Sequence, residues 1–540
     1  LVVSVSVSSQ WRSELYPADW QPPVGGSFYS DRLIQDFSYA GYQAGNRALP
    51  KARGKVFIVD SPEFGADPTG KRDSTAPIQK AIDAASAKGG IVRLGPGEYR
   101  VSLPVGQESA LRIATSGVVL QGSGVGKTFL FCTTADMRNK AIIQIQGPAS
   151  SRWRNPSFVS TPIAKDISGP TLNLPVENPT LMKPGSFCVV RADVTPEWVM
   201  DHKETNWLGH ESRLGGLAYW RKVVKVDPRT KTITLDAPTR YSLMQRDRAR
   251  VCVAEDMIHD SGIESLSIGG VERTGSEGWG EEDYTKEGSN SWHAHASSVI
   301  SVVRTRDCWI RDVSSFKSRE NPLGAHFLSN GVVASECRGL TVRNCYFCHP
   351  QFGGGGGNGY MFRLSNCSES LVEDCRAEFS RHGFVLSGMA ASGSVFHRCI
   401  DKDTGWAVGG SGRVRTAGRT SDHHMHFSHS NLFDQCVAVS SGFQAAYRPY
   451  GTPPLHNLTS AHSVYWNTRG EGSEVPLIHT AQSRYGYVIG TSGTNSAVSL
   501  ASLAKAKTDP EDHVEGVGKG DSLEPQSLYL DQKRRRLRRP

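Results

Sequence analysis

The sequence reads Val342-Arg-Asn-Cys345, Val372-Glu-Asp-Cys375, Phe396-His-Arg-Cys399 and Phe433-Asp-Gln-Cys436, four copies of one short motif. Each copy is an apolar residue, two polar residues and a cysteine. Looser copies, Ile310-Arg-Asp-Val313 and Val464-Tyr-Trp-Asn467, flank them, and the six motifs lie 32, 30, 24, 37 and 31 residues apart. Repeats of this length are typical of a solenoid, in which each repeat is one coil that stacks on the next.

The composition of the repeat predicts strands rather than helices. It is rich in β-branched and aromatic residues, is broken by Gly, Ser and Asn, and has no 3.6-residue period. Coils that stack one strand spacing apart, about 4.8 Å, place like residues above one another. We therefore expect an all-β fold, a right-handed parallel β-helix, in which four repeat cysteines form a buried ladder of small apolar side chains: Cys345, Cys375, Cys399 and Cys436.

The spacing of the cysteines does not indicate a redox motif or a zinc finger. The chain has eleven cysteines, and Cys345 and Cys348 have the spacing of a CxxC pair. Such a reading needs a second pair at finger spacing or a thioredoxin-like βαβ unit, and the sequence has neither.

We predict three regions. Residues 1–53 form an N-terminal arm, residues 54–500 the β-helix, and residues 501–540 a C-terminal extension that ends in a basic helix. A small β-rich insertion at about 150–255 interrupts the rhythm of the coils. The arm is expected to pack on the β-helix because it is rich in aromatic residues: Trp11, Tyr16, Trp20, Phe28, Phe37, Tyr39 and Tyr42.

A helix is expected just after residue 74, at the start of the β-helix. Ser74 is suited to cap it, and Ile78, Ala81, Ile82 and Ala85 follow the i, i+3, i+4, i+7 pattern of one apolar face. Such a helix would cover the first coil, whose core and strand edges would otherwise be exposed.

The segment around this helix resembles the pectate-lyase-like (pectin lyase) superfamily. The motifs that carry the resemblance are Phe64-Gly-Ala, Ile78-Gln-Lys-Ala-Ile-Asp83, Gly89-Gly90 and Pro96-Gly-Glu-Tyr99. The resemblance implies the parallel β-helix fold. It does not fix the activity, because the superfamily holds lyases, hydrolases, fructan transferases and phage tailspikes.

Charge and hydropathy argue against a membrane or a nucleic acid as a partner. No run of about 18 apolar residues occurs, which argues against a membrane-spanning helix. The net charge is +8, and residues 533–539 supply six of those charges, so we predict no nucleic-acid partner. Leu1–Ser9 resembles the remnant of a signal peptide, and the architecture favours a secreted or periplasmic protein. The oligomeric state is not defined by the sequence.

Two histidine motifs mark the candidate site. Ser380-Arg-His-Gly-Phe-Val385 and Asp422-His-His-Met-His-Phe427 lie on neighbouring coils, separated by a Gly-rich insertion that carries Arg413, Arg415 and Arg419. Together with His456 to Asn467, these motifs also resemble a subgroup of bacterial pectate-lyase-like β-helix proteins, over about residues 307–467.

The residue types favour β-elimination of an acidic, uronate-containing polysaccharide. That reaction needs a group that neutralises the carboxylate, a base for the C5 proton and an acid for the leaving oxygen. We assign Arg381 or Arg363 to the first role, His382 or His424 to the second, and Tyr360, or Tyr447 beside Arg448, to the third. The predicted substrate-binding residues are Arg363, His423, Arg448, Tyr447, Asn330, His326, Arg415 and His456.

Other chemistries stay open. A glycoside hydrolase would need two carboxyl groups, drawn from Asp374, Asp401, Asp403 and Asp422. No cofactor and no metal site are predicted, although Asp401, Asp403 and Asp422 could converge on Ca²⁺, and His424 and His426 could straddle an ion on one strand face. A non-catalytic carbohydrate-binding protein of the tailspike or adhesin kind is the remaining class.

Overall fold

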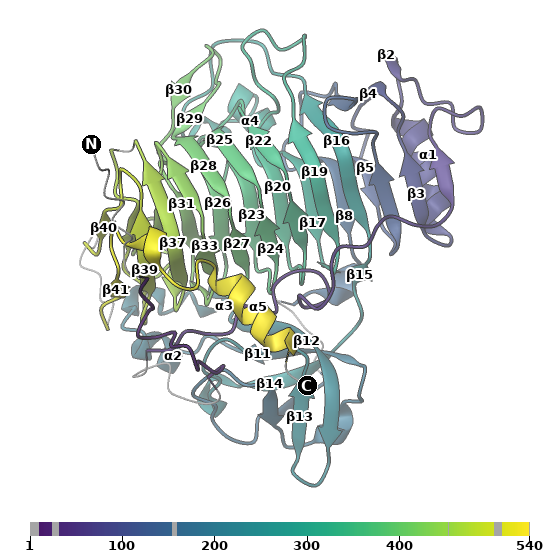
Figure 1. Ribbon diagram of the computed structural model, residues 1–540. Coiled ribbons are helices and arrows are strands. Elements are labelled where there is room, and N and C mark those ends of the chain that lie inside the picture. Colours follow the sequence, from purple (N-terminus) through teal and green to yellow (C-terminus); the bar gives the residue numbers. More distant parts are fainter. Residues whose placement is uncertain are drawn as a thin grey trace, which may run out of the picture.

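The computed structural model describes residues 10–23, 32–153, 159–451, 453–472, 474–501 and 510–538. Parallel strands of successive coils stack into one long column, as Figure 1 shows, and the predicted parallel β-helix is confirmed. Within the described residues the column has two long sheets, of 19 and 10 strands.

The larger sheet has two strand columns that meet at a corner. The first column contains β1 (Val56–Ile58), β3 (Gly90–Arg93), β6 (Val118–Gln121), β16 (Gly262–Gly270), β19 (Trp309–Ser315), β21 (Thr341–Arg343), β24 (Leu371–Glu373), β27 (Val395–His397), β33 (Leu432–Asp434), β37 (Val464–Glu471), β39 (Tyr487–Ser492) and β41 (His513–Glu515). The second contains β2 (Thr69–Asp73), β4 (Gly97–Val101), β7 (Thr128–Cys132), β22 (Tyr346–Cys348), β25 (Arg376–Ser380), β28 (Ile400–Thr404) and β34 (Val437–Val439). The long strands β16, β19 and β37 pair with both columns.

The smaller sheet closes the other side of the column. Its strands are β5 (Ser109–Ile113), β8 (Ala141–Gln146), β17 (Ser298–Val303), β20 (Asn330–Ser335), β23 (Tyr360–Ser365), β26 (His382–Ser387), β31 (Ser421–Met425), β35 (Phe443–Ala445), β38 (Ile478–Thr480) and β40 (Val498–Ser499). Short pairs complete the coils: β15 (Ile258–His259) with β18 (Thr305–Arg306), and β32 (Ser428–His429) with β36 (Ser460–Ala461). The inward-facing side chains of both sheets form one continuous apolar core.

The repeated motif is the corner of the larger sheet. The residue before each ladder position adopts a left-handed backbone, with φ between 48° and 54°: Asp312, Asn344, Asp374, Arg398, Gln435 and Asn467. The four repeat cysteines are buried directly after this turn, as predicted. All eleven cysteines are free and buried.

The last repeat differs from the prediction by one residue. Phe433 pairs with Tyr465 rather than with Val464, and Val437 pairs with Arg469. Thr468, not Asn467, therefore follows Cys436 in the ladder. The error arose because Val464 is also apolar, but it packs outside the column against the N-terminal arm and the C-terminal helix.

Helix α1 (Thr75–Ser86) covers the first coil, and its buried side chains include Ile78, Ala81, Ile82 and Ala85, as the pattern predicted. Ser74 holds the N-cap position, as predicted, but its side chain makes no capping hydrogen bond. The Ser74 hydroxyl accepts a hydrogen bond from the Asp67 backbone N–H, and the Asp73 carboxylate instead accepts one from the Thr75 N–H.

The insertion is a separate antiparallel sheet beside the column (Figure 1). Its strands are β9 (Ser160–Pro162), β10 (Asn173–Pro175), β11 (Phe187–Ala192), β12 (Leu217–Asp227), β13 (Thr232–Leu235) and β14 (Arg250–Ala254), with helices α2 (Pro196–Asp201) and α3 (Glu211–Leu214). Trp198, Trp207 and Trp220 are buried. None of the described helices is both long and apolar enough to cross a bilayer.

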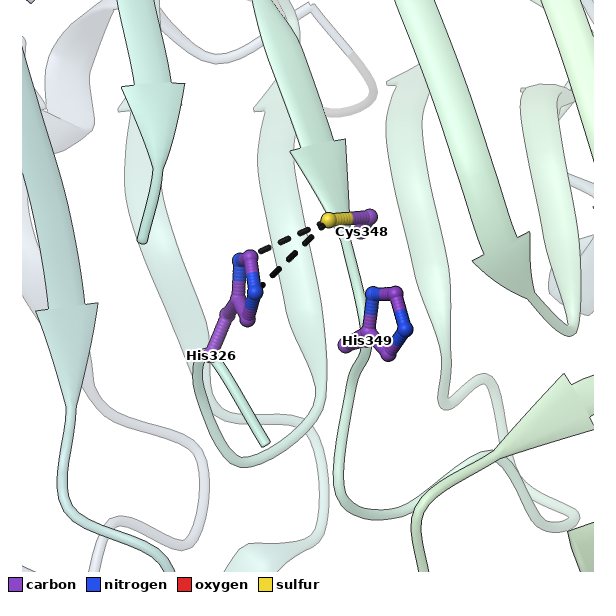
Figure 2. Close-up of side chains that lie close together, drawn as sticks. All are labelled: His326, Cys348 and His349. Carbon is purple, nitrogen blue, oxygen red and sulfur yellow. Dashed lines mark hydrogen bonds between the residues drawn. The ribbon is translucent and has the colours of Figure 1, made fainter. Parts of the chain in front are cut away.

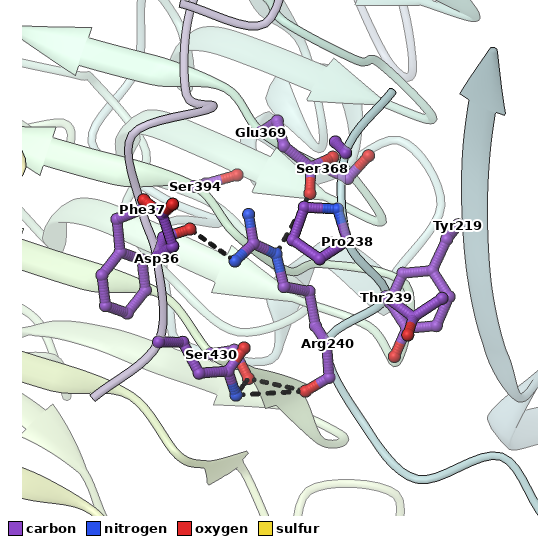
Figure 3. Close-up of polar contacts among 12 residues, drawn as sticks. Asp36, Phe37, Tyr219, Pro238, Thr239, Arg240, Ser368, Glu369, Ser394 and Ser430 are labelled. Atoms are coloured by element: carbon purple, nitrogen blue, oxygen red, sulfur yellow. Dashed lines mark hydrogen bonds and ion pairs between the residues drawn. The ribbon is translucent and has the colours of Figure 1, made fainter. Parts of the chain in front are cut away.

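Buried charges join the insertion to the column. Arg221 donates two hydrogen bonds of 2.8 Å to the Glu369 carboxylate, which follows β23, and Arg240 Nε lies 3.3 Å from the same carboxylate. Figure 3 shows Arg240 between Glu369 and Asp36 of the arm, whose backbone carbonyl it also contacts. These side chains hold three parts of the chain together.

The arm and the C-terminal helix pack on one flank of the column. Tyr16, Trp20 and Phe37 are buried with Trp466 and with Tyr529 of α5 (Leu528–Arg538). Phe28 lies outside the described residues. The basic side chains of α5 bind locally, since Arg535 pairs with Asp531 and Arg536 donates to the Ser38 carbonyl.

Candidate functional site

The two histidine motifs meet on the outer face of the smaller sheet. Side chains alternate between the faces of a strand. In register, Arg363 of β23, Val385 of β26, Asp422 of β31 and Gln444 of β35 follow one another along the column. Asp422 and His424 therefore face outward, whereas His423 between them faces the core.

Asp422 is the centre of a compact polar cluster. Its Oδ2 atom lies 2.6 Å from Arg448 Nη2, 3.2 Å from His424 Nδ1 and 3.5 Å from His382 Nδ1. His424 Nε2 lies 3.0 Å from the Tyr360 hydroxyl. The structure thus brings together three of the four predicted catalytic residues and one predicted substrate-binding residue, Arg448.

Burial sets the protonation states of the cluster. Desolvation lowers the pKa of His382 to about 4 and that of His424 to about 3, so both imidazoles are neutral near pH 7. Arg448 and the two histidines hold the pKa of Asp422 well below its usual range despite its burial. Burial raises the pKa of Tyr360, which keeps its proton. The cluster therefore consists of the Asp422–Arg448 ion pair and of three neutral side chains, His382, His424 and Tyr360, that can exchange protons.

The hydrogen bonds fix the tautomer of His382. A carbonyl only accepts, so His382 Nδ1 donates to the Thr420 carbonyl at 2.6 Å and the Nε2 lone pair is left free. His424 Nδ1 lies 3.2 Å from the Asp422 carboxylate, which accepts, and 3.0 Å from Arg448 Nη1, which donates. When Nδ1 carries the proton and donates to Asp422, the Nε2 atom accepts from the Tyr360 hydroxyl. A neutral His–Tyr pair of this kind can take and return a proton.

The glycines of the motifs allow close packing around His382. A Cβ atom at Gly383 would lie 2.4 Å from a carboxylate oxygen of Asp401, and one at Gly418 would lie 2.4 Å from the Arg381 carbonyl and 2.8 Å from His382 Nε2. The insertion that ends at Thr420 therefore covers His382. Its hairpin consists of β29 (Trp406–Ala407) and β30 (Val414–Arg415).

Solvent reaches the cluster at one side. The side chains of His424 and Arg448 are 12% and 10% exposed, whereas Asp422 is fully buried and His382 only 3% exposed. His456 is partly exposed, and its ring centre lies 5.2 Å from that of His424. The guanidinium of Arg363 lies 5.6 Å from the centre of the Tyr360 ring. These residues border the open side.

Arg381 lies next to the cluster but is engaged elsewhere. Its Nη2 atom lies 3.0 Å from the Glu281 carboxylate, and Nη1 donates to the Gly354 carbonyl. Glu281 belongs to the segment before α4 (Asn290–Ala294), which the sequence did not link to the site. Burial raises the pKa of Glu281.

Four predicted substrate-binding residues do not line the open side. His423 is buried in the core and contacts Phe433, because it occupies the inward position of β31. Tyr447 packs in the apolar cluster of the insertion. Asn330 is buried and accepts a hydrogen bond from the Tyr360 N–H, so it holds the start of β23. His326 lies beside Cys348 and His349 instead.

Arg415 is exposed on the hairpin rather than in the cluster. Arg413 and Arg415 lie 3.8 and 3.9 Å from the centre of the Trp406 ring. With Arg419 they line a separate, open pocket of about 240 Å³.

The structure does not support the two metal sites that the sequence left open, at Asp401, Asp403 and Asp422 and at His424 and His426. His382, Asp422 and His424 each offer a ligand atom within 4.8 Å of the others, but Arg448 already supplies the cation that faces Asp422. Asp401 cannot join Asp422 at a Ca²⁺ site, because it is buried in the column and accepts hydrogen bonds from Ser421, Thr404 and Ser441. His426 lies beyond the end of β31, so it does not share the strand face of His424.

The sequence reasoning left out two residues that the geometry makes central. Asp422 was considered only as a hydrolytic or Ca²⁺-binding carboxylate, although the Asp-x-His spacing places both side chains on one strand face. Gln444 accepts a hydrogen bond of 3.1 Å from Arg448 Nε and so orients it. No sequence signal marked Gln444.

Comparisons with known proteins point to carbohydrate-active β-helices. The family described as rhamnogalacturonase A/epimerase, pectate lyase-like, matches residues 59–164. Alginate lyase 7 of Azotobacter vinelandii is 46% identical over 69 residues, which is 13% of this chain and 8% of that protein. Mannuronan C5-epimerase AlgE1 of the same organism is 35% identical over 117 residues, 21% of this chain and 8% of that protein.

Two solved structures align with most of this chain. The tailspike gp61 of Pseudomonas phage phi297 gives a TM-score of 0.48 at 11% identity, covering 83% of this chain and 71% of that one. The A-module of the A. vinelandii epimerase AlgE4 gives 0.32 at 14% identity, covering 86% and 100%. The stacked coils show that this chain is a parallel β-helix, and its N-terminal motifs and the family match over residues 59–164 fit a pectate-lyase-like one.

Proposed function

We propose that the protein is a polysaccharide lyase that cleaves an acidic, uronate-containing polysaccharide by β-elimination. The observation that carries the proposal is the neutral His424–Tyr360 pair, joined at 3.0 Å and anchored by the Asp422–Arg448 ion pair on the outer face of the column. The outer face of stacked coils suits a long polymer, because it repeats along the axis.

In this proposal His424 removes the C5 proton, because it is the imidazole of the cluster that solvent reaches. The C–H electron pair forms the C4–C5 double bond while the C4–O bond breaks. Tyr360 donates a proton to the leaving oxygen, and Asp422 stabilises the imidazolium. Arg448 and Arg363 neutralise the uronate carboxylate, which acidifies the C5 proton. His382 positions Asp422 and His424.

The relatives support the substrate class. An alginate lyase and mannuronan C5-epimerases both act, by their names, on uronate polymers, and the matched segments span only 4% to 12% of them. A hydrolase is less well supported, because the carboxylate of the cluster is bound in an ion pair and Asp401 is buried in the column. The reaction needs no cofactor in this proposal, and a polymeric substrate favours a secreted or periplasmic protein.

The test is a panel of acidic polysaccharides with the full-length protein. Elimination creates an unsaturated uronate that absorbs at about 235 nm. New reducing ends without that absorbance would indicate a hydrolase. Deuterium incorporation at C5 without cleavage would indicate an epimerase. Binding without any of these changes would indicate a carbohydrate-binding protein of the tailspike kind.

A further inference from the structure

A second group of ligand-type side chains lies away from Asp422. It consists of His326, in the segment between β19 and β20, and of Cys348 and His349 at the end of β22 (Figure 2). Figure 2 shows the Cys348 side chain directed toward His326, with His349 beside it. The three residues come from two successive coils.

The distances within this group suit coordination. Each residue offers one ligand atom, and these atoms all lie within 4.8 Å of one another. Cys348 Sγ lies 3.4 Å from Nδ1 and 3.9 Å from Nε2 of His326. Sulfur and nitrogen ligands of a tetrahedral zinc ion are about 3.6 Å apart.

The hydrogen bonds leave donor atoms available. Ser315 Oγ lies 2.9 Å from His326 Nδ1, so it can hold that nitrogen while Nε2, 3.9 Å from the sulfur, serves as the ligand atom. Outer hydrogen bonds of this kind orient histidine ligands in metal sites. His349 Nδ1 is buried and has no hydrogen-bond partner among the described residues, a cost that a bound ion would remove.

Stacking explains the positions of the His326 and His349 rings, but it does not satisfy the unpaired Nδ1 atom of His349. The His349 ring stacks on Phe379 at 4.4 Å and on His326 at 5.2 Å. Glu378 adds a negative charge near His349, whereas Lys317 and Arg413 add positive charge. Because these charges partly cancel, the affinity for a cation depends mainly on the ligand atoms.

We propose that His326, Cys348 and His349 form a binding site for a zinc-class divalent ion. Two imidazole nitrogens and one thiolate are a soft ligand set that selects zinc over Ca²⁺ or Mg²⁺. His326, Cys348 and His349 supply three protein ligands, and water takes the fourth position. The ion ties the segment before β20 to the end of β22.

The experiment is a titration of the reduced full-length protein with Co²⁺ alone, followed by Zn²⁺ competition. We expect one equivalent of Co²⁺ to give a thiolate-to-cobalt absorption band that Zn²⁺ abolishes, and Zn²⁺ to raise the Tm. Cys348→Ser should remove the band, and His326→Asn should weaken binding at least tenfold. Cys132→Ser, at a buried cysteine outside the group, is the matched control and should bind as the wild type does.

Two results would overturn the proposal. One is a folded wild-type protein that binds less than half an equivalent of Co²⁺. The other is a thiolate-to-cobalt band that survives in Cys348→Ser, which would place the ion at another cysteine. A His424→Gln variant should bind Co²⁺ as the wild type does, because it keeps the proposed site intact and alters only the group of His382, Asp422 and His424.

Discussion

Two adjacent histidines on β31 have opposite surroundings. His423 faces the core and His424 faces the Asp422–Arg448 ion pair. The sequence motif Asp-His-His showed that a site was near, but both histidines looked equivalent there. Only the register of the strand, fixed by Leu386 opposite His423, separates them.

We predict that His424→Gln lowers kcat at least about 100-fold, the contribution typical of a general base, and changes the Tm little. His423→Gln is the matched control on the same strand. It should lower the Tm clearly, because it leaves a polar amide in an apolar core. Turnover and melting curves of both variants check this, and equal effects on both properties would contradict the assignment.

His382→Gln should lower kcat less than His424→Gln does. The His382 side chain is nearly inaccessible and contacts Asp422 and Thr420 rather than the open side. Steady-state kinetics of the two variants measure the difference. A larger loss in His382→Gln would make His382 the base.

Stability should fall as the pH is lowered from about 6.5 to about 4. Burial lowers the pKa of His382 to about 4 and of His423, His424, His429 and His462 to about 3, so these side chains take up protons only on unfolding. Each adds a slope of about 1.4 kcal/mol per pH unit in that window, which acts against folding at acid pH. Urea unfolding at several pH values measures the slope, and a flat profile would contradict the neutral states.

At the scale of elements, the coils could be predicted and their long connections could not. The motif at Cys345, Cys375, Cys399 and Cys436 specified the corner, because a buried small side chain must follow a left-handed turn. The last coil was displaced by one residue, since both Val464 and Tyr465 are apolar. The segment around Glu281 was missed because contacts between distant loops leave no local pattern.

The connection between β28 and β31 should control the site through Gly418. In Gly418→Ala the new methyl group would meet the Arg381 carbonyl and His382 Nε2. We expect a fall in kcat of about tenfold or more with a nearly unchanged circular dichroism spectrum. Ala417→Ser, at the exposed neighbouring position, is the control and should keep wild-type activity.

For the whole molecule, the ion network of Glu369 is the joint between the insertion and the column. Both Arg221 and Arg240 belong to the insertion, and all three side chains are fully buried. The sequence predicted an insertion that leans on the column, but no spacing rule pairs residues 129 or more positions apart.

Glu369→Gln should lower the free energy of unfolding by about 3–5 kcal/mol, because it leaves buried guanidinium groups without their counter-charge. Glu98→Gln, at a partly exposed ion pair with Arg100, should cost less than about 1 kcal/mol. Chemical denaturation of both variants tests the joint. Similar losses would show that the network contributes no more than a surface pair.

The most direct test of the account is the absorbance of unsaturated uronate formed from alginate and other acidic polysaccharides by the wild type and by His424→Gln. We predict a steady rise with the wild type on at least one polymer, unaffected by EDTA, and almost none with the variant at equal folded concentration. Equal rates for the two proteins, or cleavage by the wild type without that absorbance, would contradict elimination at the His424–Tyr360 pair.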